Sequence, residues 1–144
     1  MTKRHDWRDY RRHRGQDKGS GGEKNRTCAR ADAFMGRHYL CANRGSKIEI
    51  GDNTRIAHFV SLKTSTHKIM QSADKIAGDC YTKDIKICSG CWLCAGSIVL
   101  PGVVVGKRAI VAAGAVVTRD TGENVLVAGV PAVVKKKYPE KLCV

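Results

Sequence analysis

An aliphatic residue recurs at every sixth position through two long stretches of this 144-residue chain. The hexads are IGDNTR, IAHFVS and LKTSTH from Ile50, then ICSGCW, LCAGSI, VLPGVV, VGKRAI, VAAGAV and VTRDTG from Ile87. A helix needs apolar residues at a spacing near 3.6, and a half-buried strand alternates at every second residue. A period of six fits neither and is typical of a parallel β-helix, in which each hexad supplies one short strand and one turn.

The place of a residue within its hexad predicts where its side chain lies. The aliphatic residues at the first position should form one interior file. The fifth positions hold mostly small residues and should point inward near the corners, where only small side chains fit. Backbone hydrogen bonds then run between stacked coils. Because no coil can bury its apolar face alone, the stack is predicted to fold as a unit.

The repeat stops after His67 and resumes at Ile87, and the residues between predict a protruding loop. Residues 68–84, KIMQSADKIAGDCYTKD, have no hexad pattern. We therefore predict an all-β domain over residues 34–144, with the loop at 68–84 and a C-terminal tail at 125–144. Residues 1–33 are predicted to form a basic, flexible N-terminal arm, because residues 1–47 carry 13 basic and 5 acidic side chains.

The seven cysteines include the run Cys88-x2-Cys91-x2-Cys94, which invites a metal interpretation. An iron–sulfur run needs a fourth cysteine where Ile98 stands, and no fourth zinc ligand lies nearby. The three cysteines occupy second and fifth hexad positions, so their spacing follows from the repeat. The sequence therefore favours small buried side chains, and no metal is expected.

The chain is strongly basic, with 26 Lys and Arg against 13 Asp and Glu and a formal net charge of +13. Such a charge indicates a polyanionic partner, either nucleic acid, anionic lipid or a phosphorylated ligand. The length predicts one domain. No segment approaches the ~20 apolar residues that span a bilayer, and the first residues lack the apolar run of a signal peptide. We expect a cytoplasmic protein.

Three pieces of the sequence, in order, resemble the hexapeptide-repeat acyltransferases, and among them the maltose/galactoside and colanic-acid-type O-acetyltransferases. The pieces are IGDNTRIAHFVSLKTSTH at 50–67, TKDIKICSGCWLCAGSIVLPGVVVGKRAIVAAGAVVTRD at 82–120, and VLVAGVPAVVKKK at 125–137. The resemblance implies a left-handed parallel β-helix that assembles as a homotrimer, with the active site in the groove between two subunits. It also implies transfer of acetyl from acetyl-CoA to a hydroxyl of a sugar or another small acceptor.

The resemblance assigns the chemistry to His67 and Ala95. A hydroxyl is a poor nucleophile at neutral pH, so the family's histidine acts as general base during direct transfer through a tetrahedral intermediate. The oxyanion of that intermediate needs a preorganised N–H donor, which the resemblance assigns to the backbone of Ala95.

The resemblance also assigns binding residues. Asn43 matches a residue that contacts the acceptor, and Trp92 matches a tryptophan near the acetyl-pantetheine end. An exposed aromatic at a subunit interface is an equally good interpretation of Trp92. Ala113, Thr118 and Arg119 match positions in the family's groove for acetyl-CoA. Lys136 follows that groove and is suited to bind a phosphate, although a solvated basic run would also explain this lysine.

Two other functions fit parts of the sequence. Cys88 and Cys94 stand where the family usually has glycine, which favours a catalytically inactive hexapeptide-repeat scaffold. The basic arm favours a module that binds nucleic acid or an anionic surface. Its aromatic residues are only Trp7 and Tyr10, so base stacking has little support.

Overall fold

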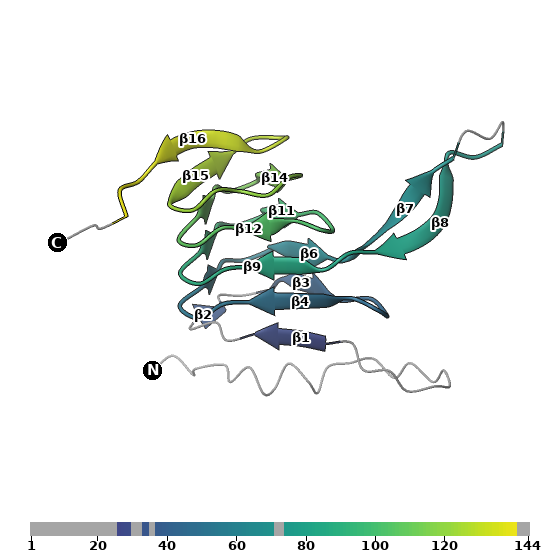
Figure 1. Ribbon diagram of the computed structural model, residues 1–144, viewed down its shortest axis with the longest axis horizontal. Coiled ribbons are helices and arrows are strands. Elements are labelled where there is room, and N and C mark those ends of the chain that lie inside the picture. Colours follow the sequence, from purple (N-terminus) through teal and green to yellow (C-terminus); the bar gives the residue numbers. More distant parts are fainter. Residues whose placement is uncertain (1–25, 30–32, 35–36, 71–73, 141–144) are drawn as a thin grey trace.

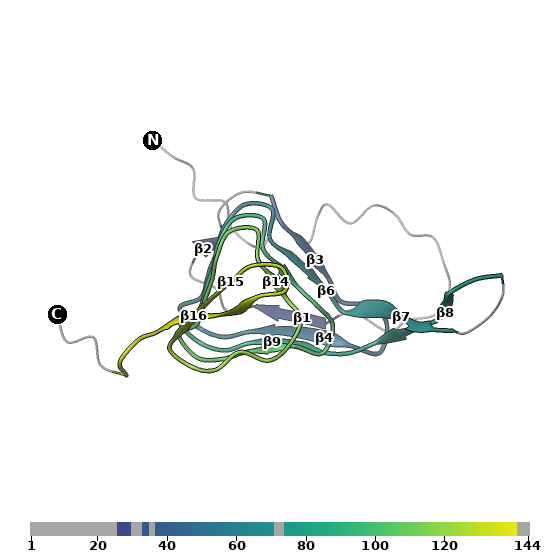
Figure 2. The same cartoon turned by 90° about the horizontal axis from the view of Figure 1, so that it is seen from above.

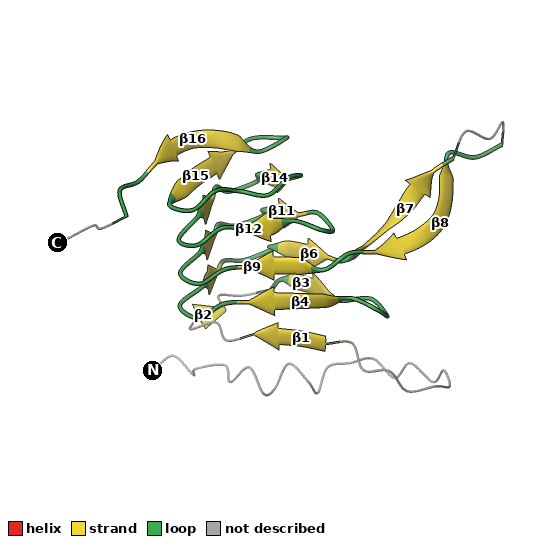
Figure 3. Cartoon of the chain, viewed as in Figure 1, coloured by secondary structure: helices red, strands yellow, loops and turns green. Residues whose placement is uncertain are grey.

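The computed structural model describes residues 26–29, 33–34, 37–70 and 74–140, and its described part is built from strands and loops (Figures 1 and 3). Three parallel sheets enclose a prism of triangular cross-section, which Figure 2 shows from above. We call its sides faces A, B and C, in the order in which the chain visits them. The fold is a left-handed parallel β-helix, as predicted.

Each face is a ladder of short strands from successive coils. Face A holds β1 (Arg26–Ala29), β4 (Lys47–Ile50), β9 (Ile85–Ile87) and β12 (Val104–Val105). Face C holds β3 (Tyr39–Cys41), β6 (Ser61–Lys63), β11 (Ile98–Val99) and β14 (Val116–Val117). Face B holds β2 (Ala33–Phe34), β5 (Arg55–Ile56), β10 (Trp92–Leu93), β13 (Ile110–Val111), β15 (Val125–Ala128) and β16 (Val133–Lys137).

The hexad pattern correctly predicts the core. All nine first-position residues are buried, with at most 5% of their surface exposed. Seven of the nine fifth-position residues are also buried, whereas Thr66 and Thr121 are half-buried. Coil-to-coil bonds such as Trp92 N–H to the Ala109 carbonyl, 2.9 Å, join the layers. Each six-residue repeat therefore forms one side of the triangular prism.

Five core residues lie outside the nine hexads: Ala42, Ile48, Ile85, Val125 and Val127. Ile48 and Ile85 are fully buried and face each other in the β4–β9 register. Both are in phase with the repeat, at the fifth position of hexads whose first residue is Arg44 or Tyr81. Those hexads lack the aliphatic residue at the first position, so the pattern alone did not identify them.

The interruption of the repeat forms an antiparallel ribbon that projects from the corner between faces C and A (Figures 1 and 2). The ribbon consists of β7 (Ser65–Ile69) and β8 (Ala77–Thr82). The chain leaves the prism after the buried Thr64 and returns at Lys83, whose N–H donates to the Thr64 carbonyl at 2.9 Å. The ribbon thus starts three residues before the predicted loop, and only half of the LKTSTH hexad lies in the prism.

Both ends of the described chain extend the stack. Strand β1 pairs with β4 from within the segment predicted to be an arm, while residues 1–25 of that arm lie outside the described residues. At the other end, β16 folds back antiparallel on β15 and forms an edge of face B. The described residues contain no helix long and apolar enough to cross a membrane.

Candidate active site

His67 lies near the base of the ribbon, on β7, with its side chain exposed. Its Nδ1 is 2.9 Å from the carbonyl oxygen of Gly78 on the neighbouring strand. A carbonyl oxygen can only accept, so this contact places the proton on Nδ1 of the neutral ring. The other nitrogen, Nε2, then keeps its lone pair, which is the state a general base requires.

The ribbon base is held by Thr64, a residue that sequence reasoning missed. Its hydroxyl accepts the N–H of Asn43 at 2.9 Å and the hydroxyl of Ser46 at 2.7 Å. The thiol of Cys41 in turn contacts the Asn43 side-chain oxygen at 3.0 Å. The structure therefore brings the predicted acceptor residue Asn43 to the corner from which the His67 ribbon leaves. The hexad pattern does not predict that the threonine at the third position of the LKTSTH hexad is buried.

Ala95 lies at a different corner, between faces B and C. It precedes Gly96, whose φ of +68° closes the turn and whose N–H donates to the His58 carbonyl at 2.9 Å. No described residue accepts the N–H of Ala95, which lies at an exposed position. This exposed donor is available to an external acceptor.

Ala113 stands directly above Ala95. The Gly114 N–H donates to the Ala95 carbonyl at 2.9 Å, and Gly114 repeats the turn with a φ of +68°. The two alanines therefore form a column of small exposed residues along the B/C corner. Such a column leaves room for an extended ligand to lie close to the backbone.

Trp92 and Lys136 share one outer ladder of face B. The register runs from Trp92 through Ile110 and Leu126 to Lys136. Half of the Trp92 surface is exposed, and the Lys136 ammonium lies 5.0 Å from the centroid of the Tyr138 ring. The two predicted binding residues thus lie on the same side of the prism, several coils apart.

Thr118 and Arg119 follow β14 at the C/A corner of the top coil, and both are exposed. This is the corner from which the His67 ribbon emerges two coils below. The predicted site residues therefore fall into two groups within one chain. His67, Asn43, Thr118 and Arg119 lie at the C/A corner, whereas Ala95, Ala113, Trp92 and Lys136 lie at the B/C corner or on face B.

The cysteine run belongs to the coil structure, as the repeat predicts. Cys91 is buried at a fifth position, as predicted, and its Sγ lies 3.1 Å from the Gly106 carbonyl. Cys88 and Cys94, at second positions, are only half-buried, which corrects the prediction of buried side chains there. Burial raises the pKa of Cys91 to about 11 and also raises the pKa of Cys94, next to Ala95. Both thiols therefore stay neutral at physiological pH. Among the described residues, no three His, Cys, Asp or Glu side chains are placed to hold a metal ion.

Comparison with known proteins agrees with the coil architecture. The family model described as bacterial transferase hexapeptide (six repeats) matches residues 84–119. Galactoside O-acetyltransferase from Lactococcus lactis is 39% identical over 90 residues, which cover 62% of this chain and 43% of that protein. The prism is therefore similar to the coil domain of the hexapeptide-repeat acyltransferases.

Two solved structures have a similar fold. A maltose O-acetyltransferase from Clostridium difficile superposes with a TM-score of 0.59 and 36% identity, covering 65% of this chain and 50% of that chain. A galactoside acetyltransferase in complex with coenzyme A superposes with a TM-score of 0.61 and 26% identity, covering 77% and 64%. The resemblance to galactoside and maltose O-acetyltransferases is thus confirmed. The chain spans about half the length of the curated relatives it matches.

Proposed function

We propose that this chain is an acetyl-CoA-dependent O-acetyltransferase that acts on a hydroxyl of a sugar or another small acceptor. The observation that carries the proposal is the bond of His67 Nδ1 to the Gly78 carbonyl, which leaves Nε2 as an exposed base. The match to galactoside and maltose O-acetyltransferases supports the reaction class.

His67 Nε2 would take the proton of the acceptor hydroxyl as its oxygen attacks the acetyl carbonyl carbon. The Ala95 N–H would stabilise the negative charge that develops on the carbonyl oxygen. When the carbon–sulfur bond breaks, the imidazolium of His67 would return the proton to the leaving thiolate. The products are an acetyl ester and free CoA, and the histidine ends in its starting state.

The residues present fit acetyl-CoA, which would supply the acetyl thioester when bound. The column of Ala95 and Ala113 offers a narrow, unobstructed track, and the exposed Arg119 and Lys136 offer cations for phosphates. A coenzyme A complex of a related acetyltransferase supports the same cosubstrate.

A homotrimer would complete the site. His67 is an exposed residue of the ribbon, which projects from the C/A corner in Figure 2, whereas the Ala95 N–H is exposed at the B/C corner of the same chain. A neighbouring copy whose B/C corner lies against the ribbon would bring these two groups together. We therefore propose that each active site lies between two subunits and takes His67 from one and Ala95 from the next.

Release of free thiol from acetyl-CoA tests the proposal. The protein is incubated with acetyl-CoA and a panel of mono- and disaccharides and simple alcohols, and the ester product is identified by mass spectrometry. Acceptor-dependent thiol release is the expected result. If calorimetry detects no binding of CoA and no acceptor promotes thiol release, the chain is a scaffold and the proposal is wrong.

A further inference from the structure

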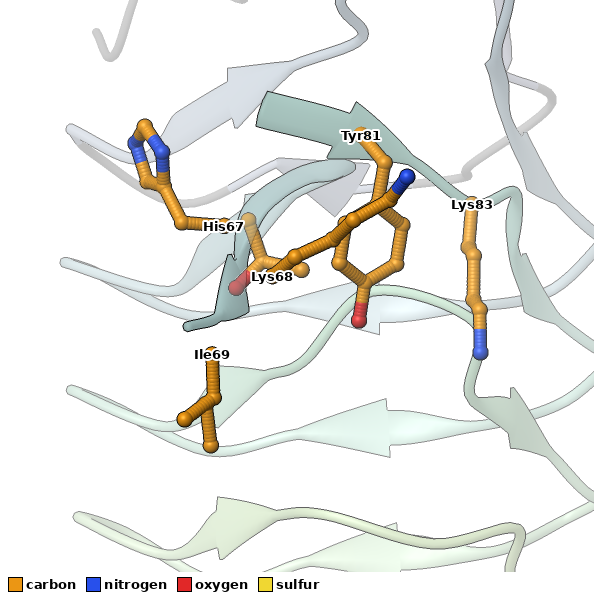
Figure 4. A pocket seen from close by; sticks show the side chains of 6 residues that line it. His67, Lys68, Ile69, Tyr81 and Lys83 are labelled. Carbon is orange, nitrogen blue, oxygen red and sulfur yellow. The ribbon is translucent and has the colours of Figure 1, made fainter. Parts of the chain in front are cut away.

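A second set of polar side chains lies on the ribbon face opposite His67. Successive side chains of a strand point to opposite faces, so Thr66 and Lys68 lie on the other side of β7 from His67. Thr66 pairs with Tyr81 across the ribbon, and Lys83 follows two residues after Tyr81. Figure 4 shows Lys68, Tyr81 and Lys83 gathered together, with the His67 ring pointing away.

Together with His67 and Ile69, these side chains line an open hollow on the ribbon. Tyr81 is half-buried, while Lys68 and Lys83 are exposed. The hollow therefore combines the face of an aromatic ring, two ammonium groups and the Thr66 hydroxyl.

Lys83 is positioned by its surroundings. Its backbone N–H donates to the Thr64 carbonyl at 2.9 Å. Its stem lies over Gly102 of the next coil, so closely that a Cβ on Gly102 would be 2.8 Å from Lys83 Cδ. Its ammonium lies 5.8 Å from the centroid of the Tyr81 ring. The absence of a side chain at Gly102 thus directs this cation toward the hollow.

The positive charge of the hollow is not neutralised by a salt bridge. Within the described ranges, neither Lys68 nor Lys83 is within ion-pair distance of a carboxylate. Asp84, next to Lys83, accepts the backbone N–H of Lys47 at 2.9 Å, and this bond orients its carboxylate away. Asp79 of β8 is exposed and is the remaining acidic residue on this strand.

We infer that this hollow is a binding site for an anionic sugar, either a carboxylated or a phosphorylated one. Two ammonium groups suit a carboxylate or phosphate group, to which lysine binds as a point charge. The Tyr81 ring offers an apolar face against which the C–H groups of a sugar ring pack, and its hydroxyl stays in water. His67 also lines the hollow, although its ring points away from Lys68 and Tyr81 in Figure 4. The binding test below uses no acetyl-CoA, so its outcome does not depend on the proposed acetyl transfer.

Calorimetric titration of the full chain tests this site with four probes. Glucuronate and glucose 6-phosphate distinguish the two anionic groups, glucose lacks the charge, and inorganic phosphate lacks the ring. We expect at least one of the anionic sugars to bind more tightly than both glucose and phosphate. Lys68→Ala and Lys83→Ala should each weaken that binding about tenfold, because each removes one charge-assisted contact.

Two further variants separate the site from general charge. Lys86→Ala removes an equal charge from the outer surface of face A, outside the hollow, and should leave binding unchanged. Tyr81→Leu should weaken the anionic sugar and leave inorganic phosphate unaffected. The inference is overturned if neither anionic sugar binds, if glucose binds equally well, or if Lys86→Ala weakens binding as much as Lys83→Ala. Circular dichroism and size-exclusion chromatography confirm that each variant keeps its fold.

Discussion

The carbonyl oxygen of Gly78 lies 2.9 Å from Nδ1 of His67, across the two strands of the ribbon. This one contact sets the orientation of the imidazole and the position of its proton. It also ties a side chain on one strand to the backbone of the other, so the ribbon itself holds the proposed base in its working tautomer.

Replacing His67 separates this structural contact from base catalysis. His67→Ala should lower kcat for acetyl transfer by about a hundredfold to ten-thousandfold, because no group then takes the acceptor proton. His67→Asn should be equally impaired, although its amide N–H can still donate to Gly78. Steady-state thiol release measures both variants. Recovery of activity by His67→Asn would show that the histidine serves only to hold the ribbon together.

Ala95→Pro removes the proposed oxyanion donor with little disturbance of the turn. The chain already places Pro101 before Gly102, whose φ is +87°, at a corner of the same form. Proline is favoured at this position of such a turn, so the fold should be retained. We expect kcat to fall by about a hundredfold to a thousandfold, because the N–H is lost.

Ala95→Ser is the matched control for that variant, since it changes the side chain and keeps the N–H. It should lose far less activity than Ala95→Pro. Equal losses in the two variants would assign the effect to crowding of the groove and would contradict the oxyanion role.

Mixing two inactive variants tests whether the site is shared between subunits. His67→Ala and Ala95→Pro chains, coexpressed with different tags, should form mixed trimers. If His67 and Ala95 act in one site from neighbouring chains, about one quarter of the sites in a random mixture carry both intact residues. Thiol release by the purified mixed trimer should therefore exceed that of either variant alone. No recovery in an assembly shown to contain both chains would contradict a site shared between neighbouring chains.

We expect Cys91 to make the free energy of unfolding depend on pH in the alkaline range. Burial raises its pKa in the folded protein from 9.0 to about 11, so the folded state holds a proton that the unfolded chain releases. This contribution is fully present below about pH 9 and is lost as pH rises toward about 11. The free energy of unfolding should fall there by at most about 1.4 kcal/mol per pH unit.

Cys91→Ala should flatten that decline, because alanine carries no titrating group. Ala109 and Ala115 occupy the same hexad position in other coils and are fully buried, so the substitution fits the coil. Urea denaturation at pH 7.5 and pH 10.5 compares the two proteins. Parallel pH profiles would show that Cys91 does not retain its proton in the fold.

The hexad pattern determined which side chains are buried. The first-position residues were predicted to form one interior file. All nine are buried, but they form three files, one inside each face, such as Ile56, Leu93 and Val111 inside face B. The prediction of burial is reliable because a prism coil repeats the same local geometry on each side, so period and burial are one property. The fifth-position Cys91 followed from the same rule. The hexad rule did not identify Ile48 and Ile85, because the first residues of their hexads are Arg44 and Tyr81 and not aliphatic residues.

The ribbon could be located in the sequence but not described from it. The loss of the six-residue period shows where the prism is interrupted. The pairing of His67 with Cys80 and the contact with Gly78, however, depend on two strands that are separate in the sequence. Likewise, Lys83 meets Tyr81 and Gly102 only because the chain returns to the corner that it left at Thr64. No local pattern encodes such contacts.

The sequence by itself therefore determined the coil, its core and the position after His67 at which the repeat is interrupted. Only the tertiary structure decided that His67 and Ala95 stand at different corners of one chain. The physical reason is that burial depends on residues within one hexad, whereas a site depends on which corners, coils and faces are brought side by side.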